Sequence, residues 1–598
     1  MTDSMCYCEH MRRNAARIHI DNASRQYLTS SGEKKISRCY LLRRSYRDEN
    51  GKPRNETIAN ISVLSDSVIS QLDKLLKGAN LTDVDNGFEI ERSLSHGDCA
   101  AADVMARQLG LKALLGPPSK ERDIAYGLIL SRAIRPRSKL STLGWWQSGD
   151  TTLGVDLGIR DVSTDDIYGA MDWLVERKAD IERKLAKRHL GEGEVAMFDL
   201  TSTWVEGTHC ELAEFGHSRD DKRGKRQIEY GLLTDKEGRP VAVEVFSGNT
   251  ADPISFKTAI SKVRDDFGLT SLVMVGDRGM ITQTRITELE KMPGMGFITA
   301  LRSSSIKALS GKDGPLQMSL FDTQNLAEIS SPDYPGERLI CCYNPLLAVE
   351  RKNKREELLK ATENDFSSIR TSIDKGRLVS ADAIGIRVGK VINKHKMGKH
   401  FRVLIGEREF SYSRDESSIN SEAATDGIYV IRTNMGSDEF SPSELVSTYK
   451  NLKHVERDFR ICKADDLDLR PIYHYHSERV IGHVLICMLS LYLTWHLRRA
   501  FSELTFSDQE IPSGDPVLKA NRSNGAKQKD KIKKNIDGFR VTSYRDLLNH
   551  LSSLRREVIN FGDTRIEKLT VPTPIQRRAF ELLGAQVPLS LASQNKSG

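Results

Sequence analysis

The sequence predicts an α/β protein in which a mixed sheet, covered by helices, lies between mainly helical regions. From residue 194 the chain shows three consecutive strand patterns, and alternating helix and strand patterns follow to residue 302. Amphipathic helical patterns dominate before residue 190 and after residue 440. At 598 residues the chain is too long for one hydrophobic core, so several domains are expected.

The composition fits a globular protein with a small excess of positive charge. Hydrophobic residues make up 38% of the chain, and 89 Lys and Arg residues against 82 Asp and Glu residues give a formal net charge of +7. This excess permits binding to nucleic acid without requiring it, because it is small for a chain of this size. The nine cysteines lack the paired C-x-x-C spacing of a structural zinc site, which favours a reduced, cytoplasmic location.

The longest apolar run, VIGHVLICMLSLYLTWHL, begins at Val480. It contains Gly482, His483 and His496 and is marginal in length for a bilayer, so a buried helix is favoured over a membrane span. The N-terminal stretch MTDSMCYCEHMRRNAARIHI has no apolar core of a signal peptide. We therefore expect no membrane partner.

Residues 1–190 are expected to form an N-terminal region. YLLRRSY (Tyr40–Tyr46) and TIANISVL (Thr57–Leu64) flank the turn signal DENGKP, as the two strands of a hairpin would. Helical patterns follow, and DCAAADVMARQLGL or STDDIYGAMDWLVERKADIERKL is a candidate DNA-reading helix of a helix-turn-helix. Amphipathic helices serve more often as packing elements, so both interpretations stay open.

Residues 191–302 carry the clearest sheet pattern. EVAMFDLTSTWVE, IEYGLLTD and PVAVEVFSG read as three adjacent strands, and the turn KEGR joins the last two into a hairpin. A helix at DPISFKTAISKVRDDFG, a buried strand at SLVMVGDRG, a helix at ITQTRITELEKM and a strand at GFITALR follow in order. This alternation predicts a mixed sheet with helices on its faces.

Residues 303–425 interrupt this order and read as an insertion, with a basic helical segment (AVERKNKREELLK) and short strands such as HFRVLIGEREFSYS. The sheet pattern resumes at DGIYVIRTN, so a second part of the sheet domain is expected at residues 426–505. The next helix begins at SPSE, where Ser441 can cap, Pro442 fits the first turn and Glu444 can complete a capping box.

The C-terminal region, residues 506–598, begins with a basic stretch, KANRSNGAKQKDKIKKN. A solvated linker and a sequence-independent phosphate contact are equally good interpretations of this stretch. Beyond it, SYRDLLNHLSSLRREVI is an amphipathic helix that packs or assembles. The stretch contains one acid, Asp530, and seven basic residues, which are Lys519, Arg522, Lys527, Lys529, Lys531, Lys533 and Lys534.

Two aspartates follow apolar strands of the predicted sheet. Asp199 comes after Val195–Phe198, and Asp277 comes after Leu272–Val275 and one glycine. A carboxylate in such a place is costly unless a cation or hydrogen-bond donors compensate it. Strand ends are also where α/β sheets assemble their sites. A turn or cap aspartate explains either residue alone, whereas the pair indicates a shared site.

A third acid, Glu456, lies in YKNLKHVERDFRICK. A period of seven places it on one helical stripe with Tyr449, Leu452, Phe459 and Lys463, and this stripe is expected to face the interior. Glu456 is thus a candidate third ligand for a hard divalent cation such as Mg²⁺, which prefers carboxylate oxygens. Tyr449 and Lys463, on the same face, are candidates for contacts with nucleic-acid phosphates.

The order of these residues resembles the DDE transposases of the IS4 class. The signature of that class is Y-(2)-R-(3)-E-(6)-K, and its tyrosine, glutamate and lysine fall on Tyr449, Glu456 and Lys463, whereas Leu452 stands in place of the arginine. DGIYVIRTN before the helix and RPIYHYHSERVIGH after it are similar to the IS1634-like branch. The resemblance extends from about Glu194 to Trp495.

The resemblance implies a fold and a division into domains. Residues 191–302 and 426–505 would form the two parts of an RNase H-like catalytic domain, separated by a β-rich insertion at residues 303–425. Residues 1–190 would bind a DNA end, and residues 506–598 would form a basic linker and a helical tail.

The resemblance also implies an activity. The protein would excise and integrate an insertion sequence by two-metal-ion phosphodiester hydrolysis and strand transfer. Asp199, Asp277 and Glu456 would be both the catalytic and the metal-binding residues, with Mg²⁺ as the cofactor and Mn²⁺ as a substitute. The expected partners are transposon ends and target DNA, bound by a homodimer in the bacterial cytoplasm and associated with the nucleoid.

Two other functions stay open. FDLTST and VGDRG each place an aspartate after a strand, as a phosphatase of the haloacid dehalogenase type does, but that chemistry needs a second aspartate at the position of Thr201. A transposase-derived DNA-binding protein that no longer cuts is the non-enzymatic alternative, and the presence of all three acids argues against it. Glu478 competes as the third ligand but lacks a Tyr and a Lys at heptad spacing. Zinc is disfavoured although His474, His476 and His483 lie nearby.

Overall fold

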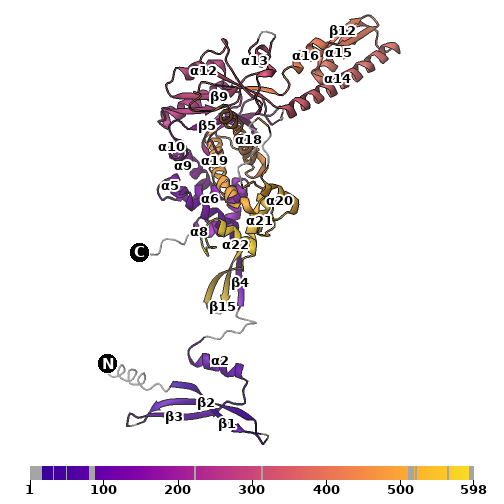
Figure 1. The fold of residues 1–598 in the computed structure, drawn as a ribbon. Helices are drawn as coiled ribbons and strands as arrows, with labels where there is room; N and C mark the ends of the chain where they lie inside the picture. Colours follow the sequence, from indigo (N-terminus) through magenta and orange to yellow (C-terminus); the bar gives the residue numbers. More distant parts are fainter. Residues whose placement is uncertain are drawn as a thin grey trace. The chain divides into compact units, whose positions relative to one another are not determined.

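The computed structural model describes residues 17–591 except residues 31, 49, 80–87, 221, 223, 312–313, 510–516, 519–521 and 562–563. Most of the N-terminal stretch in which no signal peptide is expected lies outside the described residues. The chain divides into two compact units, residues 1–91 with 558–567 and residues 92–557 with 568–598. It is a mixed α/β protein with several sheets and many helices, as the sequence predicts (Figure 1).

The first unit contains an antiparallel sheet in the order β1-β2-β3. Its strands are β1 (Arg17–Leu28), β2 (Lys34–Arg47) and β3 (Pro53–Asn60). Arg47 lies opposite Pro53 across the turn, so the predicted hairpin is confirmed. Helix α2 (Asp66–Leu76) follows. A second three-stranded sheet has the order β16-β15-β4, from β16 (Thr564–Leu569), β15 (Arg555–Phe561) and β4 (Phe88–Ser95).

Seven helices precede the main sheet in the second unit. They are α4 (Gly97–Gln108), α5 (Leu111–Leu115), α6 (Lys120–Ile134), α7 (Lys139–Ser148), α8 (Thr152–Asp156), α9 (Thr164–Glu176) and α10 (Lys178–His189). Helix α19 (Ser477–Ala500) contacts α4, α6, α9 and β7. No finding distinguishes a helix-turn-helix from plain packing here, so that interpretation stays a prediction.

Helix α19 contains the apolar run that raised the question of a membrane span. Among the described residues, the segment Ser477–Leu504 is long and apolar enough to cross a bilayer, but 83% of its most apolar window is buried inside the protein. Its side chains pack against the helices of the N-terminal part and against β7. A core helix therefore explains its composition, as the sequence predicts.

The main sheet of the second unit has eight strands in the order β10-β11-β14-β9-β8-β5-β6-β7. Strands β5, β8 and β9 run parallel, and every other neighbouring pair is antiparallel. The strands are β5 (Val195–Trp204), β6 (Gln227–Asp235), β7 (Pro240–Ser247), β8 (Leu272–Val275), β9 (Met295–Ala300), β10 (Leu326–Ile329), β11 (Arg338–Tyr343) and β14 (Ile428–Thr433). The strands predicted in the two parts of the sheet domain are confirmed.

Helices connect the parallel strands, as expected when a chain must cross over between them. Helix α11 (Asp252–Ser261) and the π-helical turn η1 (Lys262–Asp266) join β7 to β8, and α12 (Gln283–Glu290) joins β8 to β9. The middle strands are buried on both faces, which explains why VAMF and LVMV read as continuous apolar runs.

The helix expected after SPSE is interrupted, and this corrects the predicted stripe. It consists of α17 (Pro442–Lys450), α18 (Leu452–Arg460) and the π-helical turn η4 (Ile461–Asp465). Within the regular helix α18, Glu456 lies at the border of the stripe, one position after the buried Val455, whereas the break at Asn451 and the π-turn separate Tyr449 and Lys463 from that regular helix. Leu452, Phe459 and Lys463 are buried as predicted, but Glu456 is exposed.

The insertion differs from the β-rich subdomain expected at residues 303–425. Strands β10 and β11 belong to the main sheet, where β11 pairs with β14. The rest is mainly helical (Figure 1). Its elements are α13 (Ser303–Leu309), α14 (Pro345–Asp374), α15 (Ala381–His395), β12 (Phe401–Gly406), β13 (Glu409–Arg414) and α16 (Glu416–Ala423). Residues 358–419 have a hydrophobic core of their own around Phe366 and Phe401, whereas α13 packs with strands of the main sheet.

The C-terminal region is more structured than a linker. Part of the basic stretch forms helix α20 (Asn524–Ile532). Its Lys529 is buried and donates hydrogen bonds to the main-chain carbonyls of Ser502, Thr505 and Ser507. The following amphipathic helix is shorter than predicted, because α21 (Tyr544–Ser552) gives way to strand β15. Helix α22 (Pro574–Leu582) is the last element.

The capping box of α17 generates a prediction about local stability. The side chain of Ser441 accepts a hydrogen bond from the amide of Glu444, whose carboxylate accepts one from the amide of Ser441. We expect Ser441→Ala to destabilise α17 by about 1 kcal/mol, a roughly fivefold increase in opening of the helix, because the N-cap acceptor is lost. Hydrogen exchange of the peptide covering residues 442–450 measures this opening. Ser441→Asp, which keeps an acceptor, is the control, and unchanged exchange in Ser441→Ala would contradict the role of the cap.

Candidate active site

Asp199 and Asp277 lie at matching positions on neighbouring parallel strands. In the register between β5 and β8, Met197 is opposite Val275. Asp199 is two residues beyond Met197, and Asp277 is two residues beyond Val275, where the chain turns towards α12. Because both strands run in the same direction, the two carboxylates lie towards the carboxyl-terminal side of the parallel strands.

Their surroundings differ. Asp199 is half-buried within β5 and accepts a hydrogen bond of 2.8 Å from the amide of Leu200. Asp277 is exposed and accepts a hydrogen bond of 2.7 Å from the amide of Arg278. The main-chain oxygen of Asp277 accepts from the amides of Met280 and Ile281, which fixes the turn after β8. A buried acid therefore lies on a strand beside an exposed acid in a well-ordered turn.

Helix α18 brings Glu456 to these aspartates. It packs against β5 through buried side chains that include Val455 and Phe459, and the ring of Phe459 meets that of Tyr230 on β6 edge-on at 5.5 Å. Glu456 immediately follows Val455 and lies on the exposed side of the helix. The apolar face of α18 thus packs on the sheet, and the carboxylate of Glu456 lies at the border of that face, accessible to solvent.

The charges of the three acids act on each other. The pKa of Asp199 is raised to about 7, mainly by burial; the Leu200 amide and the charge of Arg219 oppose the rise, and the negative charges of Asp277 and Glu456 add smaller contributions to it. Burial likewise raises the pKa of Tyr449, and the charges of Asp277, Glu456 and Asp199 contribute. Asp199, Asp277, Glu456 and Tyr449 therefore belong to one electrostatic neighbourhood.

This donor set fits a hard divalent cation in charge and chemistry. Carboxylate oxygens are the ligands that Mg²⁺ prefers, and a cation would compensate the repulsion that raises the pKa of Asp199. Among the described residues, however, no three His, Cys, Asp or Glu side chains lie close enough together to hold a metal ion. The three acids are thus close enough to repel one another, but their carboxylates do not form a closed ligand group in this conformation.

Lys463 has internal partners. It is 8% exposed, and its ammonium donates to Thr201 Oγ1 at 2.6 Å and pairs with Asp220 at 2.8 Å. Arg470 also pairs with Asp220, at 2.7 Å. A contact between Lys463 and a DNA phosphate would require this pair to open, so the expected phosphate contact stays a prediction and is harder to make than the sequence indicates.

Two residues of the long connection between β5 and β6, Arg219 and Asp220, contact the site but were not predicted from the sequence. The guanidinium of Arg219 donates to the main-chain oxygen of Leu200 at 2.6 Å, and its charge lowers the pKa of Asp199. The side chain of Asp220 is buried between Lys463 and Arg470. The charged run SRDDKRGK was the available signal, because a connection this polar between two buried strands is unusual for a hairpin.

The alternatives from the sequence find no support in the geometry. Glu478 lies in the first turn of α19 and does not enter the electrostatic neighbourhood of Asp199. His483 donates through Nε2 to the main-chain oxygen of Leu469 and accepts at Nδ1 from Lys139, so both ring nitrogens are used. Thr201, where a haloacid dehalogenase would need its second aspartate, accepts a hydrogen bond from Lys463.

Comparison with known proteins identifies the family. The family model of the transposase DDE domain matches residues 195–493, which is half of the chain, and the model of the IS1634 family transposase N-terminal domain matches residues 29–84. No curated protein matches the chain.

Among solved structures, the chain is similar to a cryo-EM structure of a piggyBac transposase synaptic complex with hairpin DNA. The identity is 9% over 76% of each chain, with a TM-score of 0.32, a likeness too low to support an argument about this protein. The conclusion rests on the two family models, which cover the site and the N-terminal hairpin. The chain belongs to the DDE transposases of the IS1634 family, enzymes that cleave DNA and transfer its strands.

Proposed function

We propose that Asp199, Asp277 and Glu456 are the catalytic acids of this transposase and hold Mg²⁺, with Mn²⁺ as a substitute. The observation that carries this proposal is the matching register of Asp199 and Asp277 after the parallel pairing of β5 with β8, with Glu456 on a helix that packs against β5. The contribution of the charges of Asp277 and Glu456 to the raised pKa of Asp199 agrees with it. A divalent cation would stabilise the ionised form of Asp199, which burial and the charges of Asp277 and Glu456 disfavour. Two such ions, when bound, activate the attacking oxygen and stabilise the leaving one in phosphodiester chemistry.

Each of these residues would have its own part in binding the metal ion and orienting the DNA. Asp199 supplies a rigid carboxylate, because it is held within a strand and by the amide of Leu200. Asp277 supplies a second carboxylate from a hydrogen-bonded turn. Glu456 lies on α18, which is separated from α17 by an interruption of the helix at Asn451. A small movement of α18 would therefore bring the carboxylate of Glu456 close enough to Asp199 and Asp277 to complete the set of metal ligands. Tyr449, which is half-buried and within range of the charges of the three acids, would contact a phosphate oxygen.

We also propose that strands β5 to β9 and the helices around them form an RNase H-like core. The antiparallel strands β7, β6 and β5 followed by the parallel β8 and β9 support this proposal, because both aspartates then come from central strands. Residues 191–302 and 426–505 would be the two parts of this core and residues 303–425 the insertion. Residues 1–190 would bind a transposon end, and residues 506–598 would form the tail.

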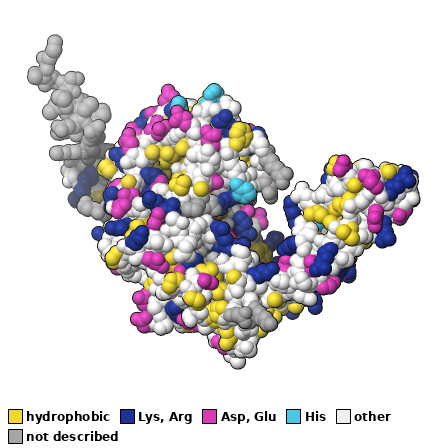
Figure 2. All heavy atoms as spheres, turned by 90° about the horizontal axis from the view of Figure 1, so that it is seen from above, with side chains coloured by type: hydrophobic (Ala, Val, Ile, Leu, Met, Phe, Trp, Pro, Cys, Tyr) yellow, Lys and Arg dark blue, Asp and Glu magenta, His cyan; other side chains and the backbone are white. Residues whose placement is uncertain are grey.

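Cutting two transposon ends together calls for two active sites, so we propose that the protein acts as a homodimer on DNA and associates with the nucleoid of a bacterial cell. Figure 2 shows Lys and Arg side chains mixed with acidic ones over most of one face and gathered more densely beside its hollow. Such gathering supports phosphate binding. Leu452, at the position of the signature arginine of the IS4 class, is buried and offers no DNA contact.

The proposal predicts the behaviour of Asp277→Asn. The purified protein, given Mg²⁺ and DNA with its cognate ends, should cut at the ends and join the resulting 3′-hydroxyl to a target strand. Asp277→Asn should reduce both steps at least 1,000-fold, on the order of the 4 kcal/mol that one catalytic group supplies, because the amide keeps the shape and loses the charge that the cation needs. A strand-transfer assay with labelled ends measures both steps.

The matched control for Asp277→Asn is Glu478→Gln, which also removes one carboxylate charge and lies outside the electrostatic neighbourhood of Asp199. Both variants should bind the end DNA like the wild type, since Asp277 is exposed and its loss leaves the core intact. Normal cleavage by Asp277→Asn would contradict the assignment. So would a loss of activity that is accompanied by unfolding, because the aspartate would then be structural.

A second prediction concerns Lys463. If its pair with Asp220 opens to meet DNA, Lys463→Ala should weaken binding to the transposon end and reduce the slope of log K against log salt by about one unit, because one phosphate contact is lost. Lys453→Ala, an exposed lysine on the same helix, is the control. An unchanged salt slope together with a lower melting temperature would show instead that Lys463 serves only as the internal partner of Asp220.

A further inference from the structure

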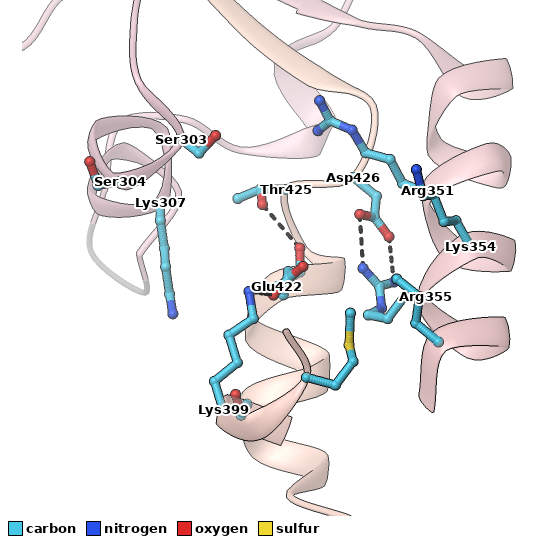
Figure 3. Close-up of a pocket in the computed structure, with 13 residues that line it drawn as sticks. Ser303, Ser304, Lys307, Arg351, Lys354, Arg355, Lys399, Glu422, Thr425 and Asp426 are labelled. Atoms are coloured by element: carbon cyan, nitrogen blue, oxygen red, sulfur yellow. Dashed lines mark hydrogen bonds and ion pairs between the residues drawn. The ribbon is translucent and has the colours of Figure 1, made fainter. Parts of the chain in front are cut away.

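Two hollows in the second unit are lined by several cationic side chains, and they differ in how those charges are compensated. The first, about 500 Å³, lies between α13, α14 and α16 (Figure 3). Two of its cations are paired, Arg355 with Asp426 and Lys399 with Glu422. The others are exposed to water, where an uncompensated charge costs little. This hollow gives no physical reason to require a ligand.

The second hollow, about 460 Å³, lies between α6, the start of α7, α9 and the loop before α19. We call it the cationic pocket, and it is defined by Arg132, Arg137, Lys139, Arg470, His474 and His483. Two of these cations, Arg132 and Lys139, are each only 6% exposed. Burial on this scale removes the water that normally stabilises a charge, so the pocket should contain an anionic partner.

The hydrogen bonds of Lys139 show that it has donors to spare. Its ammonium lies 3.1 Å from Nδ1 of His483, and Nε2 of His483 lies 3.0 Å from the main-chain oxygen of Leu469. A carbonyl can only accept, so Nε2 carries the hydrogen and Nδ1 accepts from the lysine. This arrangement uses one of the three N–H donors of Lys139 and contributes no negative charge.

The acids of the region do not neutralise the buried cations. Arg132 donates to the main-chain oxygens of Leu467 and Asp468, which are uncharged acceptors. Arg470 shares Asp220 with Lys463. The one acid that lines the pocket, Asp468, is exposed, and among the described residues no ion pair joins a carboxylate to Arg132 or Lys139.

The pKa values of the pocket agree with this imbalance. The pKa of Lys139 is lowered to about 7, mainly by burial and in smaller part by the charge of Arg132. Burial also lowers the pKa of His474 to about 3, with contributions from Lys139, Arg479 and Arg132. The charge of Arg132 thus disfavours the protonation of Lys139 and His474, and a bound anion would oppose this effect.

We propose that the cationic pocket binds a phosphate group, and that a DNA strand supplies it. A phosphate offers several acceptor oxygens for the free donors of Lys139 and the guanidinium of Arg137. The first residues of α7 line the pocket, so the positive end of a ten-residue helix adds to the attraction. The exposed Tyr473 at the same pocket offers a surface on which a neighbouring base can stack.

The pocket is connected to the candidate active site. Arg470, which lines it, pairs with Asp220, and Asp220 holds Lys463 against Thr201, two residues beyond Asp199 on β5. A phosphate in the pocket would therefore place its strand near the catalytic acids. The source of the phosphate, a DNA strand, rests on the transposase function, whereas the phosphate site itself does not.

The first experiment measures thermal unfolding of the full chain at pH 6.5 with increasing inorganic phosphate, at constant ionic strength made up with chloride. The melting temperature of the wild type should rise with phosphate and saturate, as linkage requires for a ligand of the folded state. In Lys139→Met the apparent affinity for phosphate should fall tenfold or more, because a charge-assisted hydrogen bond is lost. Arg137→Gln, an exposed change that spares the core, should weaken phosphate binding several-fold.

The matched control is Lys529→Met. Lys529 is buried to a similar degree but is bonded to three main-chain carbonyls away from the pocket, so its loss should lower the melting temperature and leave the phosphate-dependent rise intact. A phosphate-dependent rise that persists in both Lys139→Met and Arg137→Gln would overturn the pocket. If Lys139→Met does not fold, Arg137→Gln alone decides.

The second experiment measures binding of duplex DNA with a transposon end in the absence of divalent metal, so that catalysis does not enter. Arg137→Gln and Lys139→Met should each weaken binding and reduce the salt slope by about one unit. If both variants lose the phosphate effect but bind DNA with an unchanged salt slope, the phosphate site stands and DNA as its source is overturned. If Asp277→Asn fails to block cleavage, the catalytic proposal is wrong, but the results of the phosphate and DNA-binding experiments are unaffected.

Discussion

The candidate active site is organised around one carboxylate, Asp199, which lies in the middle of a buried strand. Its flanking residues on β5 are apolar and buried, and burial raises its pKa to about 7. A folded chain tolerates such a group only if something nearby compensates the charge when it forms. Here the compensation comes from an amide, from Arg219 and, in our account, from a divalent cation that Asp277 and Glu456 help to hold.

The architecture around Asp199 follows from this constraint. The parallel pairing of β5 with β8 places Asp277 at the same edge of the sheet, and the apolar face of α18 fixes the helix that carries Glu456. Asp199 and Asp277 are therefore held by the sheet and the turn after β8, whereas Glu456 is held by a helix that begins after the interruption at Asn451. This difference explains how the acids interact electrostatically although their carboxylates do not form a closed ligand group.

Much of the fold was predictable because its signals are local. The strands of the main sheet read as continuous apolar runs, and the capping box at Ser441 and Glu444 marks the start of α17. The burial of Glu456 was predicted wrongly, because a seven-residue period marks only the direction of a stripe, and Glu456 lies at its border, next to the buried Val455. The insertion was also mispredicted, since short strands do not reveal that β10 and β11 extend the main sheet.

The candidate site was predictable only in part. Asp199 and Asp277 could be found because each follows a short apolar run, although β5 continues through Asp199 to Trp204 and only Asp277 lies beyond the end of its strand. Arg219 and Asp220 lie in a connection whose path the sequence does not reveal. The internal pairing of Lys463 depends on Asp220, more than 200 residues away in sequence, and the cationic pocket combines α6, α7 and the loop before α19. Such contacts arise from tertiary packing, so no periodicity in the sequence can indicate them.

The central claim is that one cation site joins Asp199, Asp277 and Glu456. Anomalous diffraction from crystals of the protein grown with Mn²⁺ and end DNA tests it most directly, because the metal is located independently of the protein. Our account predicts an anomalous peak about 2.2 Å from carboxylate oxygens of Asp199 and Asp277, with Glu456 as a ligand of the same site. A peak at other residues, or a Glu456 that remains remote from a metal bound by the two aspartates, would contradict it.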